Sequence, residues 1–248
     1  MDNVLSIRSL TVEFSGFKAV DSLNLDIARG EIRVVIGANG AGKTTLMDAI
    51  SGKASASQGQ ILFNSADITN WPEHRIARAG IGRKFQIPSI FKNLSVRQNY
   101  QVALSQEPRV LHNVFRRPRD TARIEDVLNL VGLTGSADEP AGNLSHGQTQ
   151  WMELGMVLVQ DPALILLDEP TAGMTVAETS RTADIINRLH GRHTILVVEH
   201  DMAFVRSICR TITVMHMGRK LAEGPVEEIE NHPAVREAYL GSGGIGHA

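Results

Sequence analysis

Cysteine is almost absent from this sequence, because Cys209 is the single one among 248 residues. One thiol cannot form an internal disulfide, which excludes the disulfide-bonded secreted scaffolds and favours a reducing compartment. Long apolar runs are missing too, since no segment approaches the ~18 uninterrupted apolar residues that a membrane-spanning helix needs. The first ten residues carry an acid at position 2 and no apolar core, which is not the pattern of a secretory signal. We therefore expect a chain that is soluble by itself.

An excess of charge of either sign is also lacking. Lysine and arginine number 25 and aspartate and glutamate 27, which gives a formal net charge of −2. Nucleic-acid-binding domains usually carry a basic surplus, so no nucleic-acid partner is expected. Aromatic residues make up 4% and hydrophobic residues 42% of a sequence without repeats, which is typical of an ordinary globular protein. The length suffices for one large core, or for a core with a smaller attached lobe.

Two short segments near the start alternate apolar and polar residues. In residues 10–14 and 23–27 every second side chain is apolar, which favours half-buried strands of an antiparallel sheet. Four later segments are nearly all apolar, as expected for a parallel sheet that helices cover on both faces. These segments are residues 31–37, 163–169, 194–200 and 211–218. The pattern predicts an α/β protein.

Residues 88–155 have a different pattern, because helical periodicity dominates there. Segments 95–106 and 123–133 both place apolar residues at helical spacing. We interpret residues 88–155 as a helical subdomain inserted into an α/β core. The core is then formed by residues 1–87 and 156–248, and the whole chain is one domain.

Residues 37–44 read GANGAGKT and fit the phosphate-loop pattern G-x-x-x-x-G-K-[ST]. They follow a predicted strand and open a predicted helix, which is the context that the chemistry needs. Backbone N–H groups of such a loop wrap the phosphates, Lys43 reaches the β and γ phosphates, and the Thr44 hydroxyl is a ligand for Mg²⁺. The predicted nucleotide-binding residues of the loop are Gly37, Asn39, Gly40, Ala41, Gly42, Lys43, Thr44 and Thr45.

Polar residues end two further apolar segments. Ligands of open α/β sheets bind beyond the carboxyl ends of the strands, and residues 163–169 deliver two carboxylates there. Asp168 is predicted to hold Mg²⁺ through water, and Glu169 to orient or deprotonate the attacking water. His200, which follows another strand, is predicted to contact the γ-phosphate. Strands also often end in surface acids, so these assignments depend on the phosphate loop.

Three other features leave alternatives open. Phe14, like Phe17, can stack on an adenine ring or cap the core, since Phe14 continues the apolar face of residues 10–14. Residues 190–193, HGRH, lack the cysteine or carboxylate that would complete a metal site, so an exposed turn is favoured. The basic residues 115–119 are predicted to be a solvated surface, with contact to a partner or to lipid headgroups as the alternative.

A second helix start occurs at residues 143–151, NLSHGQTQW, where Ser145 and Gly147 precede a helix-like run. Unpaired backbone N–H groups and the helix dipole make such a start an anion site. The order of an aromatic residue, GANGAGKTT, FQ, LSHGQ, ILLDEP and VVEHD resembles the nucleotide-binding subunit of ATP-binding-cassette (ABC) transporters over nearly the whole chain. The resemblance implies the ABC ATPase fold: a phosphate-loop NTPase (RecA-like) core, an N-terminal antiparallel β subdomain and an inserted α-helical subdomain.

In the resembled family two subunits pack head to tail with two ATP molecules between them. The phosphate loop of one subunit faces the signature helix of the other, and a two-fold interface places every such contact twice. The resemblance implies that Phe14 stacks on adenine, that Gln86 senses Mg²⁺ and the lytic water, and that His200 is the switch histidine. The signature residues that it assigns to the partner's nucleotide are Ser145, Gly147 and Gln148. The catalytic residues are then Glu169, His200 and Gln86, and the Mg²⁺ ligands are Thr44, Gln86 and Asp168.

Partners and location also come from the resemblance. It implies a second ATPase subunit, for which a heterodimer is expected before a homodimer, and transmembrane permease subunits. The coupling helices of these permeases would dock near Gln86 and the helical subdomain, and a periplasmic substrate-binding protein would be an indirect partner. The chain is then cytoplasmic and peripheral on the inner face of the cell membrane, with ATP and Mg²⁺ as its cofactors.

Two positions depart from the commonest family pattern. His146 replaces the first glycine of LSGGQ, while Gly147 keeps the close backbone approach. Thr175 stands where the loop after Pro170 usually carries Asp or Asn, and its hydroxyl can still hydrogen-bond across the dimer.

The cargo is predicted only from the similarity of short sequence segments. GIGRKFQIP and the ending VREAYLG resemble the branched-chain amino-acid importer type, whereas LSHGQTQWMELGM and DEPTAGMT most resemble the urea importers. Urea or a short-chain amide is therefore the expected cargo, with branched-chain amino acids or lipopolysaccharide export as alternatives. A soluble ABC ATPase of ribosomes or DNA usually has two cassettes or a coiled-coil insert, and a small-molecule kinase would lack LSHGQ.

Overall fold

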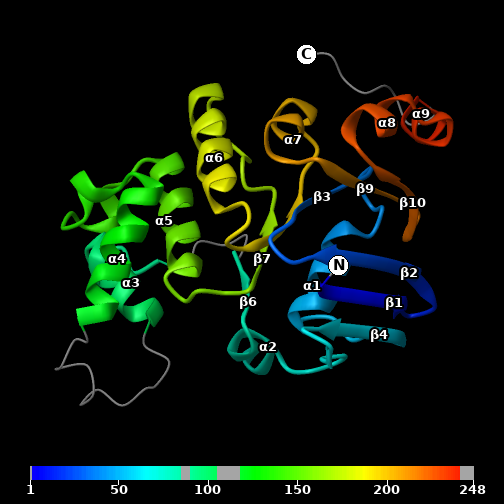
Figure 1. Ribbon diagram of the computed structural model, residues 1–248, viewed down its shortest axis with the longest axis horizontal. Coiled ribbons are helices and arrows are strands. Elements are labelled where there is room, and N and C mark those ends of the chain that lie inside the picture. The colour runs from blue at the N-terminus through cyan, green and yellow to red at the C-terminus, as the bar shows by residue number, and fades with distance from the viewer. Residues whose placement is uncertain (1, 85–89, 105–117, 241–248) are drawn as a thin grey trace. The chain divides into compact units, whose positions relative to one another are not determined.

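The computed structural model describes residues 2–84, 90–104 and 118–240. The chain divides into two compact units. The α/β unit comprises Met1–Ile81, Ala163–Glu169 and Leu189–Ala248, and the helical unit comprises Gly82–Pro162 and Pro170–Arg188. Figure 1 labels the helices and most of the strands of both units.

One sheet of the α/β unit is antiparallel and has the strand order β2-β1-β4-β5. β1 (Asn3–Phe14) and β2 (Phe17–Ala28) pair around a two-residue turn at Ser15 and Gly16, whose φ angles are 49° and 87°. Turns with two positive φ angles match the twist of paired strands. β4 (Gln58–Phe63) pairs with β1 and with the short β5 (Ala66–Asp67). The predicted N-terminal antiparallel sheet is thus present.

The second sheet has the order β10-β9-β3-β8-β7-β6. Its parallel strands are β3 (Ile32–Ile36), β7 (Leu164–Asp168), β8 (Thr194–Val198) and β9 (Thr211–His216). β10 (Arg219–Gly224) forms an antiparallel hairpin with β9, and β6 (Ile81–Arg83) is the other edge strand. Every residue of β3, β7 and β8 is buried, as the uniformly apolar segments predict. Because these strands are parallel, their carboxyl ends lie at one edge of the sheet.

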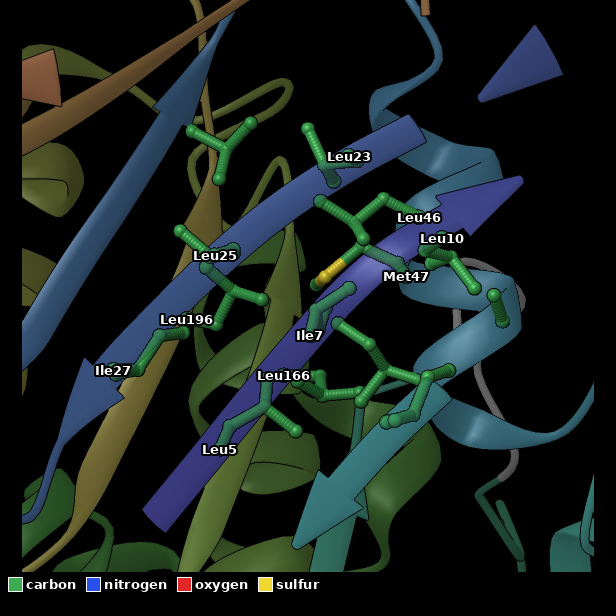
Figure 2. Packing of buried hydrophobic residues seen from close by; sticks show 14 of the residues in the cluster. Leu5, Ile7, Leu10, Leu23, Leu25, Ile27, Leu46, Met47, Leu166 and Leu196 are labelled. Carbon is green, nitrogen blue, oxygen red and sulfur yellow. The ribbon is translucent and has the colours of Figure 1, made fainter. Parts of the chain in front are cut away.

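The core of the α/β unit joins both sheets to helix α1 (Lys43–Ser51). Figure 2 shows apolar side chains of β1, β2 and α1 gathered around Leu166 of β7 and Leu196 of β8. Burying one such side chain contributes about 1.5–3 kcal/mol. The helix that follows the phosphate loop is therefore held firmly against both sheets. The residues labelled in Figure 2 are Leu5, Ile7, Leu10, Leu23, Leu25, Ile27, Leu46, Met47, Leu166 and Leu196, each at most 1% exposed.

Short helices complete the α/β unit. The Asp201 carboxylate caps one of them, α7, by accepting the Ala203 and Phe204 N–H groups. These helices are α2 (Glu73–Ala79), α7 (Met202–Ile208), α8 (Val226–Asn231) and α9 (Pro233–Leu240). Within the described parts of both units, no helix is long and apolar enough to cross a membrane.

The helical unit contains the predicted helical insert and one helix more. Its helices are α3 (Val96–Leu104), α4 (Pro118–Val131), α5 (His146–Leu158) and α6 (Val176–Leu189), of which α6 extends one residue beyond the unit. The Trp151 Nε1–H of α5 donates to Thr182 Oγ1 of α6 at 2.9 Å, and the Arg181 guanidinium lies 4.2 Å from the centre of the Trp151 ring. These contacts place residues 170–188 with the helical unit, whereas the sequence analysis assigns them to the core.

Cys209 provides a test of the packing within the α/β unit. The side chain is buried, and burial raises the pKa of its thiol from 9.0 to about 12. Because the thiolate is the reactive form, we expect iodoacetamide to label the native chain at pH 8 at least about a hundredfold more slowly than the denatured chain. Stability should also fall as the pH rises from 9.0 towards about 12, since the unfolded chain loses this proton first. Equal labelling rates in the two states would contradict the described core.

Candidate functional site

The phosphate loop between β3 and α1 turns on two glycines with positive φ angles, 79° at Gly40 and 99° at Gly42. Residues with a Cβ rarely adopt such angles. α1 begins directly after Gly42, which offers no side chain to cap the first N–H groups of the helix. These N–H groups need an outside partner, and a phosphate is a suitable one.

Backbone atoms of neighbouring strands press against this loop. A Cβ on Gly37 would lie 2.4 Å from the Met215 carbonyl oxygen of β9, and one on Gly42 would lie 2.3 Å from the Ala19 carbonyl oxygen of β2. The N–H of Gly218 also donates to the Ala41 carbonyl at 3.0 Å. Both glycines are therefore required by the available space, and Gly42 by its φ angle as well.

Lys43 folds back over the loop. Its ammonium donates to the carbonyl oxygens of Gly37 at 2.7 Å and Ala38 at 3.1 Å. Burial lowers the pKa of Lys43, and the negative charges of Glu169 and Asp168 partly offset this effect. A cation held beside unpaired helix N–H groups forms a site for phosphate. The two acids are close enough to interact with it electrostatically.

The two acids take different positions at the end of β7. Asp168, the last residue of the strand, is 7% exposed. Glu169 donates its N–H to the Val198 carbonyl of β8 at 2.9 Å, but its φ angle of 45° turns the chain sharply out of the sheet. Such a conformation costs about 1–3 kcal/mol in a residue other than glycine and often occurs at functional sites. Its side chain is 42% exposed, so this carboxylate is much more open to solvent than that of Asp168.

His200 lies beside Glu169. Its Nδ1 is 3.6 Å from Glu169 Oε1, and its backbone N–H donates to the Glu199 carboxylate at 3.0 Å. Glu199 is 1% exposed, so this buried carboxylate fixes the backbone at His200. The sequence analysis misses the role of Glu199, although a charged residue at the end of a uniformly apolar strand is a signal that could have revealed it.

Mg²⁺ fits the residues at this edge as an ion that arrives with the nucleotide. It usually takes one or two carboxylates and completes its shell with water and substrate phosphates. Thr44 is an exposed residue in the first turn of α1 and can supply a hydroxyl, and Asp168 can supply a carboxylate. No group of three or more metal-binding side chains occurs among the described residues, so a preformed metal centre is not indicated there. Gln86, the third predicted ligand and a predicted catalytic residue, lies outside the described residues.

Phe14 and Phe17 flank the β1–β2 turn with 53% and 66% of their surfaces exposed. The expectation that Phe14 continues the buried face is wrong. The pairing register shifts between Val12 and Glu13, and the buried run ends at Val12. An exposed ring does not cap the core, so its apolar face is open to a flat ligand such as adenine.

The signature segment forms the start of α5 in the helical unit. Ser145 Oγ accepts the Gln148 N–H at 3.2 Å, and Gln148 Oε1 accepts the Ser145 N–H at 2.9 Å. This capping box stabilises the first turn. It uses the side chain of Gln148 but leaves the Ser145 hydroxyl proton for an anion.

Gly147 lies against the first turn of α6. A Cβ on it would be 2.2 Å from Glu178 Oε1, so any other residue would have to displace this carboxylate. Glu178 also accepts the N–H and hydroxyl of Thr175, both at 2.9 Å. The Thr175 hydroxyl proton is thus used within the chain, and a hydrogen bond of this hydroxyl across a dimer stays a prediction. The pattern T-x-x-E at residues 175–178 is a capping signal that the sequence analysis misses.

Two further predictions concern surface segments. Residues 190–192 form an exposed turn and His193 is half-buried, which agrees with the favoured alternative. The basic residues 115–117 lie outside the described residues.

Known proteins with similar sequences agree on one family. A family model described as ABC transporter matches residues 20–172, and one described as branched-chain amino acid ATP-binding cassette transporter matches residues 219–245. The chain is 36% identical over 249 residues to the high-affinity branched-chain amino acid transport ATP-binding protein LivG of Escherichia coli (strain K12), covering 96% of this chain and 98% of LivG. BraF of Pseudomonas aeruginosa, described in the same words, is 34% identical with the same coverage of 96% and 98%. The chain belongs to the ABC transporter family.

Solved structures support the same conclusion. The ADP conformation of MJ1267, an ATP-binding cassette of an ABC transporter, has a TM-score of 0.85 at 27% identity and covers 97% of this chain and 100% of its own. A nucleotide-free ATP-binding cassette from an ABC transporter gives 0.82 at 29% identity. The predicted ABC ATPase fold and ATPase activity are therefore confirmed. The roles of single residues in this ABC ATPase stay predictions.

Two glycines of the loop offer a matched test of its geometry. Gly42→Ala and Gly40→Ala both place a Cβ at a positive φ angle, but only the Cβ at Gly42 meets a backbone oxygen, whereas nothing lies within 4 Å of the one at Gly40. We expect Gly40→Ala to lower the free energy of unfolding by about 1 kcal/mol and Gly42→Ala by at least about 2 kcal/mol more. Urea denaturation measures both values. Equal losses would contradict the close contact with β2.

Proposed function

We propose that this ABC ATPase is the motor subunit of an importer and hydrolyses MgATP in a head-to-tail dimer. The observation that carries the proposal is the cluster of Lys43, Asp168, Glu169 and His200 at the carboxyl edge of the parallel sheet. Lys43 interacts electrostatically with both acids, and His200 lies 3.6 Å from Glu169. Phosphate, metal and water therefore each find a matching group at this edge.

The residues divide the chemistry among them. Lys43 exchanges the carbonyls of Gly37 and Ala38 for the β and γ phosphates, and the N–H groups of α1 take up further phosphate oxygens. Glu169 orients a water molecule and accepts its proton as the water oxygen attacks the γ phosphorus. The bond between that phosphorus and the bridging oxygen breaks, and ADP and phosphate leave. His200 donates to the γ-phosphate and holds Glu169 in place. Mg²⁺, when bound by Asp168 and Thr44, neutralises phosphate charge.

The start of α5 supports the dimer. Its capping box orders the first turn and leaves the Ser145 hydroxyl proton for an anion. In a head-to-tail dimer this helix start would meet the γ-phosphate on the partner's loop, and ATP would close the dimer until it is hydrolysed. The partner is a second ATPase subunit, with a heterodimer expected first.

The dimer would work against permease subunits on the inner face of the cell membrane, with a periplasmic binding protein as an indirect partner. LivG and BraF are transport ATP-binding proteins for branched-chain amino acids, and both match nearly the whole chain. They favour branched-chain amino acids as the cargo. Urea or a short-chain amide is the second candidate, because the segment LSHGQTQWMELGM resembles the urea importers.

Uptake of labelled leucine and labelled urea separates the two cargos. Uptake would be measured in cells of the source organism from which the gene for this chain has been deleted. The same cells would then be measured after the wild-type gene or the gene for the Glu169→Gln variant has been restored. Loss of leucine uptake alone supports the first cargo, and loss of urea uptake alone the second. Unchanged uptake of both would contradict an importer for either solute.

Glu169→Gln tests the catalytic base. The amide keeps the size of the side chain but cannot take the water's proton, so turnover should fall by about 10²–10⁴-fold. ATP should still bind, and the trapped nucleotide should produce a dimer in size-exclusion chromatography with MgATP. Glu73→Gln, an exposed change on α2, is the control and should behave as the wild type. An unchanged elution volume of Glu169→Gln with MgATP would contradict the ATP-dependent dimer.

Ser145→Asp separates capping from phosphate contact. Aspartate caps helices as well as serine does, so the free energy of unfolding should stay within about 0.5 kcal/mol. The added negative charge should repel the partner's γ-phosphate and lower the ATPase rate more than tenfold, roughly, while nucleotide affinity in dilute monomer stays the same. Ser145→Ala is the comparison, since it loses the cap at a cost of about 1 kcal/mol without adding charge. Full activity of Ser145→Asp would mean that Ser145 only caps α5.

A further inference from the structure

His146 is the first residue of α5, and its exposed ring contacts the loop that follows strand β7 and Glu169. Nε2 lies 3.2 Å from the Ala172 carbonyl oxygen. Since the carbonyl accepts, Nε2 carries the proton. Gly173, the next residue, has a φ angle of 74°, and a Cβ there would lie 3.2 Å from the same nitrogen. The ring therefore lies directly against the backbone of this loop.

The other end of the loop is held by Glu178. Its carboxylate accepts the N–H and hydroxyl of Thr175, and the Thr175 hydroxyl accepts the Glu178 N–H at 3.3 Å. The same carboxylate lies against Gly147, beside His146. The pKa of Glu178 is lowered, first by the Thr175 N–H, then by the Thr175 hydroxyl, and also by the charge of His146. Residues 172–175 are thus attached to the start of α5 at both ends.

Further along, α5 and α6 are joined by a buried contact. Trp151 donates to Thr182, one turn after Glu178, and Arg181 lies over the Trp151 ring. Arg181 also donates to the Gly132 carbonyl at 2.9 Å. The two helices and the loop before α6 therefore form one packed element within the helical unit, and His146 is its contact at the exposed end.

We infer that His146 is a positioning residue for ATP hydrolysis: it holds the Ala172–Thr175 loop against the start of α5, so that both present one fixed surface to the partner's nucleotide. The inference rests on the proposed head-to-tail dimer. Glycine, the commonest family residue at position 146, has no side chain to make this contact. In this chain the imidazole supplies the hydrogen bond, and Glu178 and Thr175 supply the rest.

The test compares three variants of the full-length chain. His146→Leu keeps most of the side-chain volume and removes the donor, whereas His146→Gln restores an N–H donor at similar reach. His190→Leu removes an exposed histidine from a turn in the α/β unit and is the control. Thermal unfolding of all three should match the wild type, because both histidines are exposed.

Two readouts are taken on each variant. Amide hydrogen exchange of the peptide that covers residues 171–176 reports the loop itself and needs no enzymatic activity. Steady-state ATPase assays with MgATP report kcat and KM. The loss of one exposed hydrogen bond should speed exchange and lower kcat about two- to fivefold in His146→Leu, with KM nearly unchanged. His146→Gln should restore both values, and His190→Leu should change neither.

Each contrary result has a distinct meaning. Unchanged exchange in His146→Leu would show that the ring does not hold the loop, and faster exchange with unchanged kcat would show that the contact has no part in hydrolysis. Failure of His146→Gln to restore kcat would also overturn the inference. A wild-type chain without ATPase activity would instead refute the proposed function, while the exchange data would still decide whether the contact exists.

Discussion

Backbone contact at two glycines is the constraint on which the site depends. The phosphate loop keeps its shape because carbonyl oxygens of β9 and β2 lie where Gly37 and Gly42 have no side chains. The loop is therefore clamped between both sheets of the α/β unit, and α1 behind it is buried in their common core (Figure 2). A loop fixed in this way keeps Lys43 near Asp168 and Glu169, so no free energy is needed to rearrange these groups at each turnover. Electrostatic preorganisation requires such a fixed arrangement.

Two helix starts in different units carry groups for one kind of ligand. α1 has no side-chain cap, so its first N–H groups are available to an anion, whereas α5 has a complete capping box and keeps the Ser145 hydroxyl proton. A monomer with one nucleotide needs the first start alone. The proposed two-fold pair would use both, because each subunit would complete the other's site. This difference gives the second start a physical role in the proposed motor.

The sequence predicts the elements whose signal is local. Uniformly apolar segments identify the buried parallel strands, and the spacing of Gly37, Gly42 and Lys43 identifies the phosphate loop before the family is known. Prediction from the sequence fails where strand register or tertiary packing determines which residues are buried and to which unit they belong. The register shift near Val12 exposes Phe14, and the contacts of Trp151 with α6 place residues 170–188 in the helical unit. Glu178 and Glu199 bond groups close to them in the chain, so a T-x-x-E pattern and an acid at the end of an apolar strand were local signals for them that the predictions left unused.

The central claim is that ATP lies between two copies of the fold, each of which supplies part of the pocket. Disulfide cross-linking tests it directly, because Cys209 is the one native thiol and can be changed to Ser. One chain would carry Asn39→Cys in the phosphate loop and another Ser145→Cys in the signature segment, both with Glu169→Gln. The account predicts a covalent dimer when the two chains are mixed with MgATP under mild oxidation, and little without nucleotide. Absence of this dimer, with an intramolecular disulfide in a single chain that carries both cysteines, would contradict it.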